Sequence, residues 1–185
     1  MLTSPFSSLS DIAEKKLTFF LATATVCILY GMLRIDYYLI NDVCENGILS
    51  FEFAKDFNIS KTILNSWNTK SKICAGISLG LDFLFLMIYP LLIALLIHKL
   101  NETIWKGHSF YFVGIILLFS QLLTAILDTI ENIGLIQLLL GSTNSNWSLI
   151  AYYCAFIKFT IISIALIYLA INFIPLIIKN TTKNE

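Results

Sequence analysis

The chain has 185 residues, of which 57% are hydrophobic and only 13% are charged, and its mean hydropathy is +0.80. Soluble domains carry about 25% charged residues, so this composition indicates a membrane protein. Twelve basic residues balance twelve acidic ones. No cluster of Lys and Arg is dense enough to neutralise several phosphates, which argues against a nucleic-acid partner. We expect one integral membrane domain over residues 1–185, with the lipid bilayer as its partner.

The first apolar segment, at residues 17–40, follows a polar leader that ends at Lys16. Ser10 or Asp11 is placed to cap a helix at this point. A cleaved signal peptide is the competing interpretation. However, the Arg-Ile-Asp sequence at 34–36 stands where a cleavage site needs small residues. We therefore expect an uncleaved first span.

Residues 41–72 form the one long polar connection. Residues 48–54 within it favour a short strand or an interfacial stretch. Ser60 is expected to cap a helix at residues 61–68 that has one apolar face. Trp67 fits an anchor at the membrane interface. We expect this extramembrane loop to form a lid on the membrane surface.

Three further apolar segments follow at residues 73–97, 109–140 and 147–178. A bilayer-spanning helix needs about 20 residues, so each segment is long enough. The linkers at 98–108 and 141–146 are short, which makes neighbouring helices antiparallel. The prediction is an all-α fold, a four-helix transmembrane bundle with up-down-up-down topology and a short amphipathic loop helix between spans one and two.

Positive charges are distributed slightly unevenly between the two sides of this bundle. Six lysines lie on the side of the termini, whereas four lysines and Arg34 lie on the side of the long loop. The positive-inside rule therefore favours a multi-pass protein of the cell membrane with both termini in the cytoplasm.

Ionisable residues interrupt the apolar segments where lipid tolerates them poorly. Asp82 lies in the second segment, Asp128 and Glu131 lie in the third, and Lys158 lies in the fourth. At a rise of 1.5 Å per residue, all four lie about 13–18 Å below the loop side. A charge at the bilayer centre costs at least about 2.5–3.5 kcal/mol, so such residues usually face the bundle interior. We expect one buried polar cluster.

Helical spacing extends this cluster. Asn132 follows Asp128 by four residues and lies on the same helix face, and Tyr89 follows Asp82 by seven. Arg34 and Asp36, near the end of the first segment, are placed to cap the group from above.

The carboxylates outnumber the cations, so full ionisation would leave excess negative charge in a site of low dielectric constant. At least one acid must then bind a proton or be neutralised by a cation. Acid and carboxylate side by side can act as general acid and general base. The leading hypothesis is a pocket for a lipophilic small molecule, with the following candidate catalytic residues: Asp82, Asp128 and Glu131. The candidate ligand-binding residues are Lys158, which would set the ionisation of the acids, Asn132, Tyr89 and Arg34.

Two other functions remain open. One is a non-enzymatic structural or assembly protein whose polar cluster fixes helix packing. The other is a proton or cation pathway, although few polar residues continue the cluster towards the far side. Whether the chain is an enzyme, and its oligomeric state, are not determined by the sequence.

No cofactor or metal site is indicated. None of the four cysteines forms a C-x-x-C pair, although Cys44 and Cys74 flank the same loop and are close enough in sequence to pair on an oxidising side. His98 and His108 lack a neighbouring carboxylate or cysteine at a spacing typical of metal ligands.

Several motifs resemble a group of uncharacterised small bacterial four-span membrane proteins. The segments LGLDFLFLMIYP and LLTAILDTIENIGL supply its D-x-x-F…Y and D-x-x-E-N patterns, and Phe-Ile-Lys-Phe supplies the later Lys. With FEFAKDF…ILNSW, the resemblance spans most of residues 20–170. It implies a four-span protein of the bacterial inner membrane and no particular activity. A looser likeness to four-span sterol isomerase-type proteins rests on acids inside helices, but their intramembrane histidine has no match here.

Overall fold

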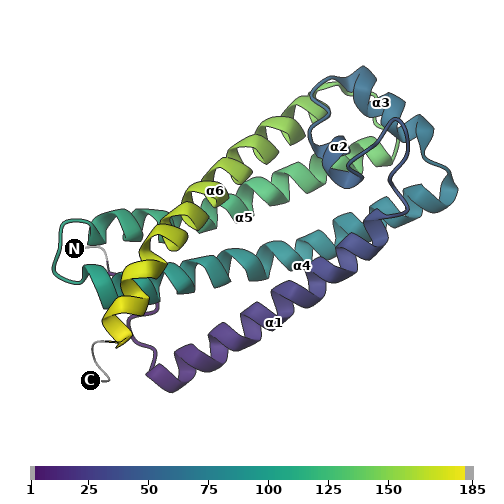
Figure 1. Cartoon of the computed structure of the whole chain (residues 1–185). Helices are drawn as coiled ribbons and strands as arrows, with labels where there is room; N and C mark the ends of the chain where they lie inside the picture. The colour runs from purple at the N-terminus through teal and green to yellow at the C-terminus, as the bar shows by residue number, and fades with distance from the viewer. Residues whose placement is uncertain (1–2, 182–185) are drawn as a thin grey trace.

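Four long helices form an antiparallel bundle (Figure 1). The computed structural model describes residues 3–181, with the side chains of residues 3–173. The long helices are α1 (Asp11–Asp36), α4 (Thr69–Leu100), α5 (Tyr111–Leu139) and α6 (Asn146–Thr181). All four are long and apolar enough to cross a membrane. The predicted all-α four-helix fold with a helical loop is therefore confirmed.

Three shorter elements complete the fold. Helices α2 (Ile48–Glu52) and α3 (Phe57–Ser66) lie together at one end of the bundle, between α1 and α4 in sequence (Figure 1). The π-helix η1 (Asn101–Trp105) extends α4 at the opposite end. We call the end with α2 and α3 the loop end.

Side-chain caps explain where the helices begin. Ser10 Oγ accepts a hydrogen bond from the backbone N–H of Ala13 at 3.3 Å, as predicted for the start of α1. Asn68 Oδ1 accepts from the N–H of Ser71 at 2.9 Å and starts α4. Such caps satisfy N–H groups that have no partner within the helix.

The loop differs from the sequence prediction in two places. Residues 48–52 form helix α2 and not a strand. Helix α3 begins at Phe57, because Asp56 is its N-cap. Ser60, the predicted cap, lies inside α3. Its Oγ donates to the carbonyl of Ala54 at 3.2 Å and lies 2.9 Å from Ser148 Oγ of α6.

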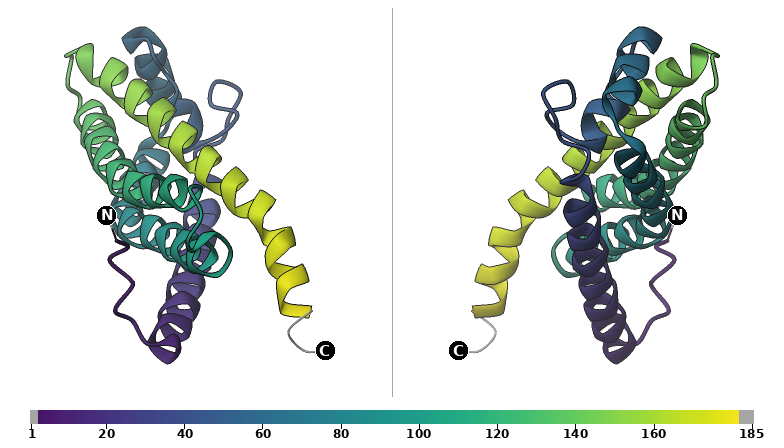
Figure 2. Two further views of the ribbon diagram at one scale, coloured as in Figure 1. Left: turned by 90° about the vertical axis from the view of Figure 1, so that its left-hand side faces the viewer. Right: turned by 90° about the vertical axis from the view of Figure 1, so that its right-hand side faces the viewer.

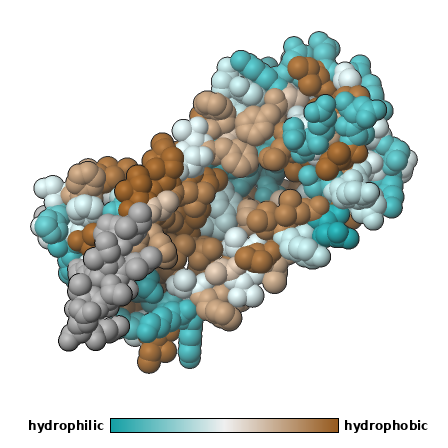
Figure 3. Space-filling view, viewed as in Figure 1, coloured by the Kyte–Doolittle hydropathy of each residue, from teal (hydrophilic) through white to brown (hydrophobic). Residues whose placement is uncertain are grey.

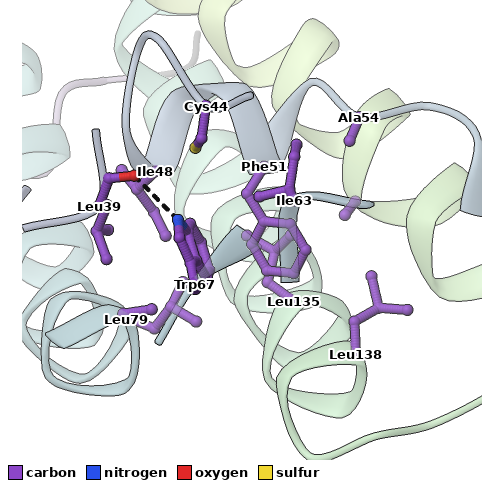
Figure 4. Close-up of a cluster of buried hydrophobic side chains, with 12 residues drawn as sticks. Leu39, Cys44, Ile48, Phe51, Ala54, Ile63, Trp67, Leu79, Leu135 and Leu138 are labelled. Atoms are coloured by element: carbon purple, nitrogen blue, oxygen red, sulfur yellow. Dashed lines mark hydrogen bonds between the residues drawn. The ribbon is translucent and has the colours of Figure 1, made fainter. Parts of the chain in front are cut away.

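Trp67 also differs from its predicted role as an interfacial anchor. Only 3% of its surface is exposed, and its indole N–H donates to the carbonyl of Leu39 at 2.9 Å. The ring packs edge-on against Phe51, with 5.3 Å between centroids (Figure 4). The loop carbonyl gives the indole N–H a partner, so the large ring can be buried in the hydrophobic core. The loop is thus docked on the bundle by a core of its own.

Helix α1 is the least buried of the four long helices. It packs mainly along α4, and Leu21 is its only buried side chain. Away from the loop end, α1 and α6 diverge from each other (Figure 2). Residues of both helices line a cavity, which is described below.

Candidate functional site

The buried polar cluster is built around Lys158 of α6. Its Nζ lies 2.7 Å from Asp128 Oδ1 and 2.8 Å from Glu131 Oε2, both on α5. The Tyr89 hydroxyl of α4 donates to the other oxygen of Asp128 at 3.1 Å. The four residues therefore connect three helices through charge-assisted contacts, which are stronger than neutral ones.

Asp82 forms the second part of the cluster. The amide of Asn132 donates to Asp82 Oδ2 at 2.7 Å, and the Asp82 carboxyl lies within electrostatic reach of Asp128 and Lys158. The structure therefore brings together six of the seven predicted site residues, all of them buried: Asp82, Tyr89, Asp128, Glu131, Asn132 and Lys158.

Arg34 is the predicted site residue that lies elsewhere. It is exposed and is not among the residues that line the cavity beside the cluster. Its neighbour Asp36 does line that cavity, and Asp36 Oδ1 accepts a hydrogen bond from the N–H of Ile48 at 2.6 Å. Asp36 therefore holds the first turn of α2.

Gly47 makes this attachment possible. Its φ of +56° lies in the region that favours glycine, and a Cβ added there would collide with the Asp36 carboxylate. The close approach of Gly47 to Asp36 sets the position of α2, and with it the position of the last residue of that helix.

That last residue, Glu52, belongs to the site and was not predicted. Only 6% of its surface is exposed. Burial raises the pKa of its carboxyl well above the usual range, and the charge of Glu131 raises it further, whereas Lys158 opposes the shift. A single acid between apolar residues in the segment ILSFEFA was the sequence signal available, but a strand prediction did not direct its side chain to the cluster.

A cavity of about 510 Å³ adjoins the cluster. Its lining comes from α1, α2, α4 and α6, with Asp128 from α5, and it includes Glu52, Asp82 and Lys158. The remaining lining is mostly apolar and extends along α4 and α6 through these residues: Phe85, Leu92, Ile93, Leu96, Leu166 and Leu169. The face between α1 and α6 is recessed, with apolar residues along its rims (Figure 3).

Three buried polar atoms point to an occupant of this cavity. Thr25 Oγ1, Glu52 Oε2 and Ser78 Oγ have no hydrogen-bond partner among the described residues, and all three residues line the cavity. A buried polar group without a partner costs about 1–3 kcal/mol. Because their residues line the cavity, a side-chain rotation would bring these atoms within reach of water or a ligand in it.

A larger hollow of about 980 Å³ lies at the opposite end. It is lined by residues from the N-terminal segment and the α4–α5 connection, including Glu14, His98, Glu102 and His108. Within the described residues, no group of three or more His, Cys, Asp or Glu is arranged to hold a metal ion. All four cysteines are free, and Cys44 Sγ donates to the carbonyl of Gly47 at 3.0 Å.

Comparisons with protein-family models, curated proteins and solved structures each gave no match.

Proposed function

We propose that the protein is a multi-pass protein of the bacterial inner membrane, with both termini in the cytoplasm, that binds a lipophilic small molecule between α1, α4 and α6. The observation that supports this function is a cavity of about 510 Å³ with apolar walls and buried carboxylates at one end. Ligand pockets commonly measure about 300–1,000 Å³ and combine apolar walls with a few fixed polar groups.

The ligand would enter from the lipid. Helix α1 packs mainly on α4, and α1 diverges from α6 away from the loop end (Figure 2). The face between α1 and α6 is recessed (Figure 3), and a molecule dissolved in the bilayer would reach the cavity from this face without crossing the polar cluster. The docked loop covers the other end, where Ile48, Leu49 and Glu52 of α2 line the cavity.

Acid–base conversion of the ligand is the reaction that we propose for this site. Lys158 contacts Asp128 and Glu131. The Asp36 carboxylate, which also lines the cavity, accepts a hydrogen bond from the N–H of Ile48. Asp82 and Glu52 are therefore the buried carboxyl groups at the cavity with no contact to the lysine shorter than 4 Å. Burial and the charge of Glu131 favour the protonated form of Glu52, which would be the proton donor, whereas Asp82, oriented by Asn132, would be the proton acceptor.

The structural alternative is supported by a specific observation too. The contacts of Lys158 join α5 to α6, and Tyr89 joins α4 to the same group. Such a network would fix helix packing even with no ligand bound. The two functions differ in what a cavity-filling substitution does, because filling the space leaves the network intact.

Native mass spectrometry in a non-ionic detergent, with 1-dodecanol as the probe, distinguishes the ligand-binding function from the structural one. We expect the wild-type protein to bind one dodecanol molecule. Leu166→Trp should fill the cavity and abolish dodecanol binding, whereas Leu123→Trp should leave the binding unchanged. Leu166 lines the cavity and is 50% exposed, whereas Leu123 is 47% exposed on α5 away from it. Asp82→Asn should keep the folded yield and weaken binding. Equal dodecanol binding by Leu166→Trp and wild type would contradict the proposed pocket.

A further inference from the structure

The buried charges of the cluster do not balance. Among the described residues, the buried acids are Glu52, Asp82, Asp128 and Glu131, and Lys158 is the buried lysine that faces them. Lys158 is already engaged by two carboxylates, at 2.7 and 2.8 Å. A further cation at this end of the cavity would therefore meet carboxyl groups that no protein cation contacts.

The unpartnered atoms specify where that cation would lie. Glu52 Oε2 and Ser78 Oγ are buried, lack hydrogen-bond partners among the described residues, and belong to residues lining the cavity beside Asp82. A carboxylate oxygen only accepts hydrogen bonds, and a hydroxyl can do so. Several N–H donors on one small group would satisfy both atoms.

The rest of the cavity suits a hydrocarbon chain. From Asp82 the lining continues along α4 as far as Leu96, a distance of about 21 Å at 1.5 Å per residue. On the facing side, α6 contributes Ile162, Leu166 and Leu169. A narrow apolar region of this length favours an aliphatic tail over a compact polar molecule.

We propose that the cavity takes an amphipathic amine, with its protonated nitrogen between Glu52, Asp82 and Ser78 and its aliphatic chain along α4 and α6. This inference rests on the proposed pocket and names its ligand class. A fatty acid or a phosphate headgroup would place negative charge beside four buried carboxyl groups, and the one buried lysine is already paired. A neutral alcohol would fill the apolar region but leave the charge unbalanced.

The test compares three probes of equal chain length: dodecylamine, 1-dodecanol and dodecanoate. Their binding to the full chain in a non-ionic detergent is measured by native mass spectrometry at neutral pH. We expect the amine to bind at least about tenfold more tightly than the alcohol, because a hydrogen bond to a charged group is stronger than one between neutral groups. Dodecanoate should bind most weakly.

Matched variants assign the preference to the site. Glu52→Gln keeps the shape and prevents this carboxyl from ionising beside the bound amine, so the amine should lose most of its advantage over the alcohol while alcohol binding persists. Glu45→Gln makes the same change at an exposed position of the same loop and should leave the preference intact. If Glu52→Gln does not fold, Asp82→Asn tests the same point through the ratio of amine to alcohol affinity, which should fall even though alcohol binding is itself weakened.

Each result has a distinct meaning. Equal binding of amine and alcohol would overturn the amine inference and leave the lipophilic pocket standing. Tightest binding of dodecanoate would also overturn it and would make Lys158 the ligand contact. No binding of any probe would overturn both the inference and the proposed function.

Discussion

The two ends of the bundle contain the same kinds of ion pair in opposite surroundings. At the loop end the side chain of Lys158 is 5% exposed, and its nitrogen lies 2.7 Å from Asp128 and 2.8 Å from Glu131. At the opposite end Lys106 lies 3.0 Å from Glu102, but the lysine side chain is 76% exposed. The N–O distances of the two ion pairs are similar, whereas the two lysine side chains differ greatly in burial. Burial therefore decides how much each lysine contributes to stability and which end can discriminate between ligands by charge.

The largest effect is expected from Lys158→Met. The substitution leaves two buried carboxylates without a cation, and breaking a buried pair in this way costs about 3–5 kcal/mol. Chemical unfolding in detergent, followed by helical circular dichroism, measures the loss. Adding Asp128→Asn and Glu131→Gln to the same chain should restore much of it, because no uncompensated charge then remains. A loss below about 1 kcal/mol in the single variant would show that the cluster is hydrated and not buried.

The second largest loss of stability is expected from Trp67→Phe at the loop end, compared with Trp105→Phe at the opposite end. Trp67→Phe removes the indole N–H from the buried carbonyl of Leu39, and an unsatisfied buried group costs about 1–3 kcal/mol. Trp105→Phe removes a bond of equal length, 2.9 Å, to Asn172 at the less buried end. Unfolding free energies of the two variants measure the contrast. Equal losses would mean that the indole hydrogen bond of Trp67 contributes no more to stability than that of Trp105.

How much of this was accessible from sequence depends on how local the determining interaction is. The four long helices follow from segment length and apolarity, and the meeting of Asp82, Asp128, Glu131 and Lys158 follows from equal depth along antiparallel helices. Both predictions require only the length and rise of an α-helix.

Arg34 and Glu52 were misplaced or missed because their positions depend on distant contacts. The pattern of α1 does not fix its rotation, since the helix is apolar on most sides and buries only Leu21. The position of Glu52 depends on the Asp36–Ile48 hydrogen bond and on the close approach of Gly47 to Asp36. No local sequence pattern predicts either contact.

The pH dependence of stability should separate Glu52 from the exposed acids. Its pKa is raised above the ordinary value of 4.5, so the folded state binds more protons than the unfolded state as the pH rises past that value. The contribution of Glu52 is thus fully present below pH 4.5 and is lost as the pH rises through the folded-state pKa.

We therefore expect the melting temperature of wild type to fall with rising pH more steeply than that of Glu52→Gln. Asp82, Asp128, Glu131 and Lys158 face the same carboxyl and are present in both proteins, so the difference between the two curves reports Glu52 together with its coupling to them. Glu45→Gln, exposed in the same loop, should follow wild type. Parallel curves for wild type and Glu52→Gln would mean that the carboxyl is ionised in the fold.

The smallest effect is expected from Lys106→Met. Exposed ion pairs contribute about 0–1 kcal/mol, and pairs four residues apart contribute about 0.3–0.5 kcal/mol. Salt makes the contrast with Lys158 sharper, because at 1 M ionic strength the screening length is only about 3 Å. The cost of Lys106→Met should then vanish, whereas the cost of Lys158→Met should persist, since ions do not enter the buried cluster. Unfolding of both variants at low and high salt measures this, and a salt-sensitive Lys158 would place the cluster in contact with water.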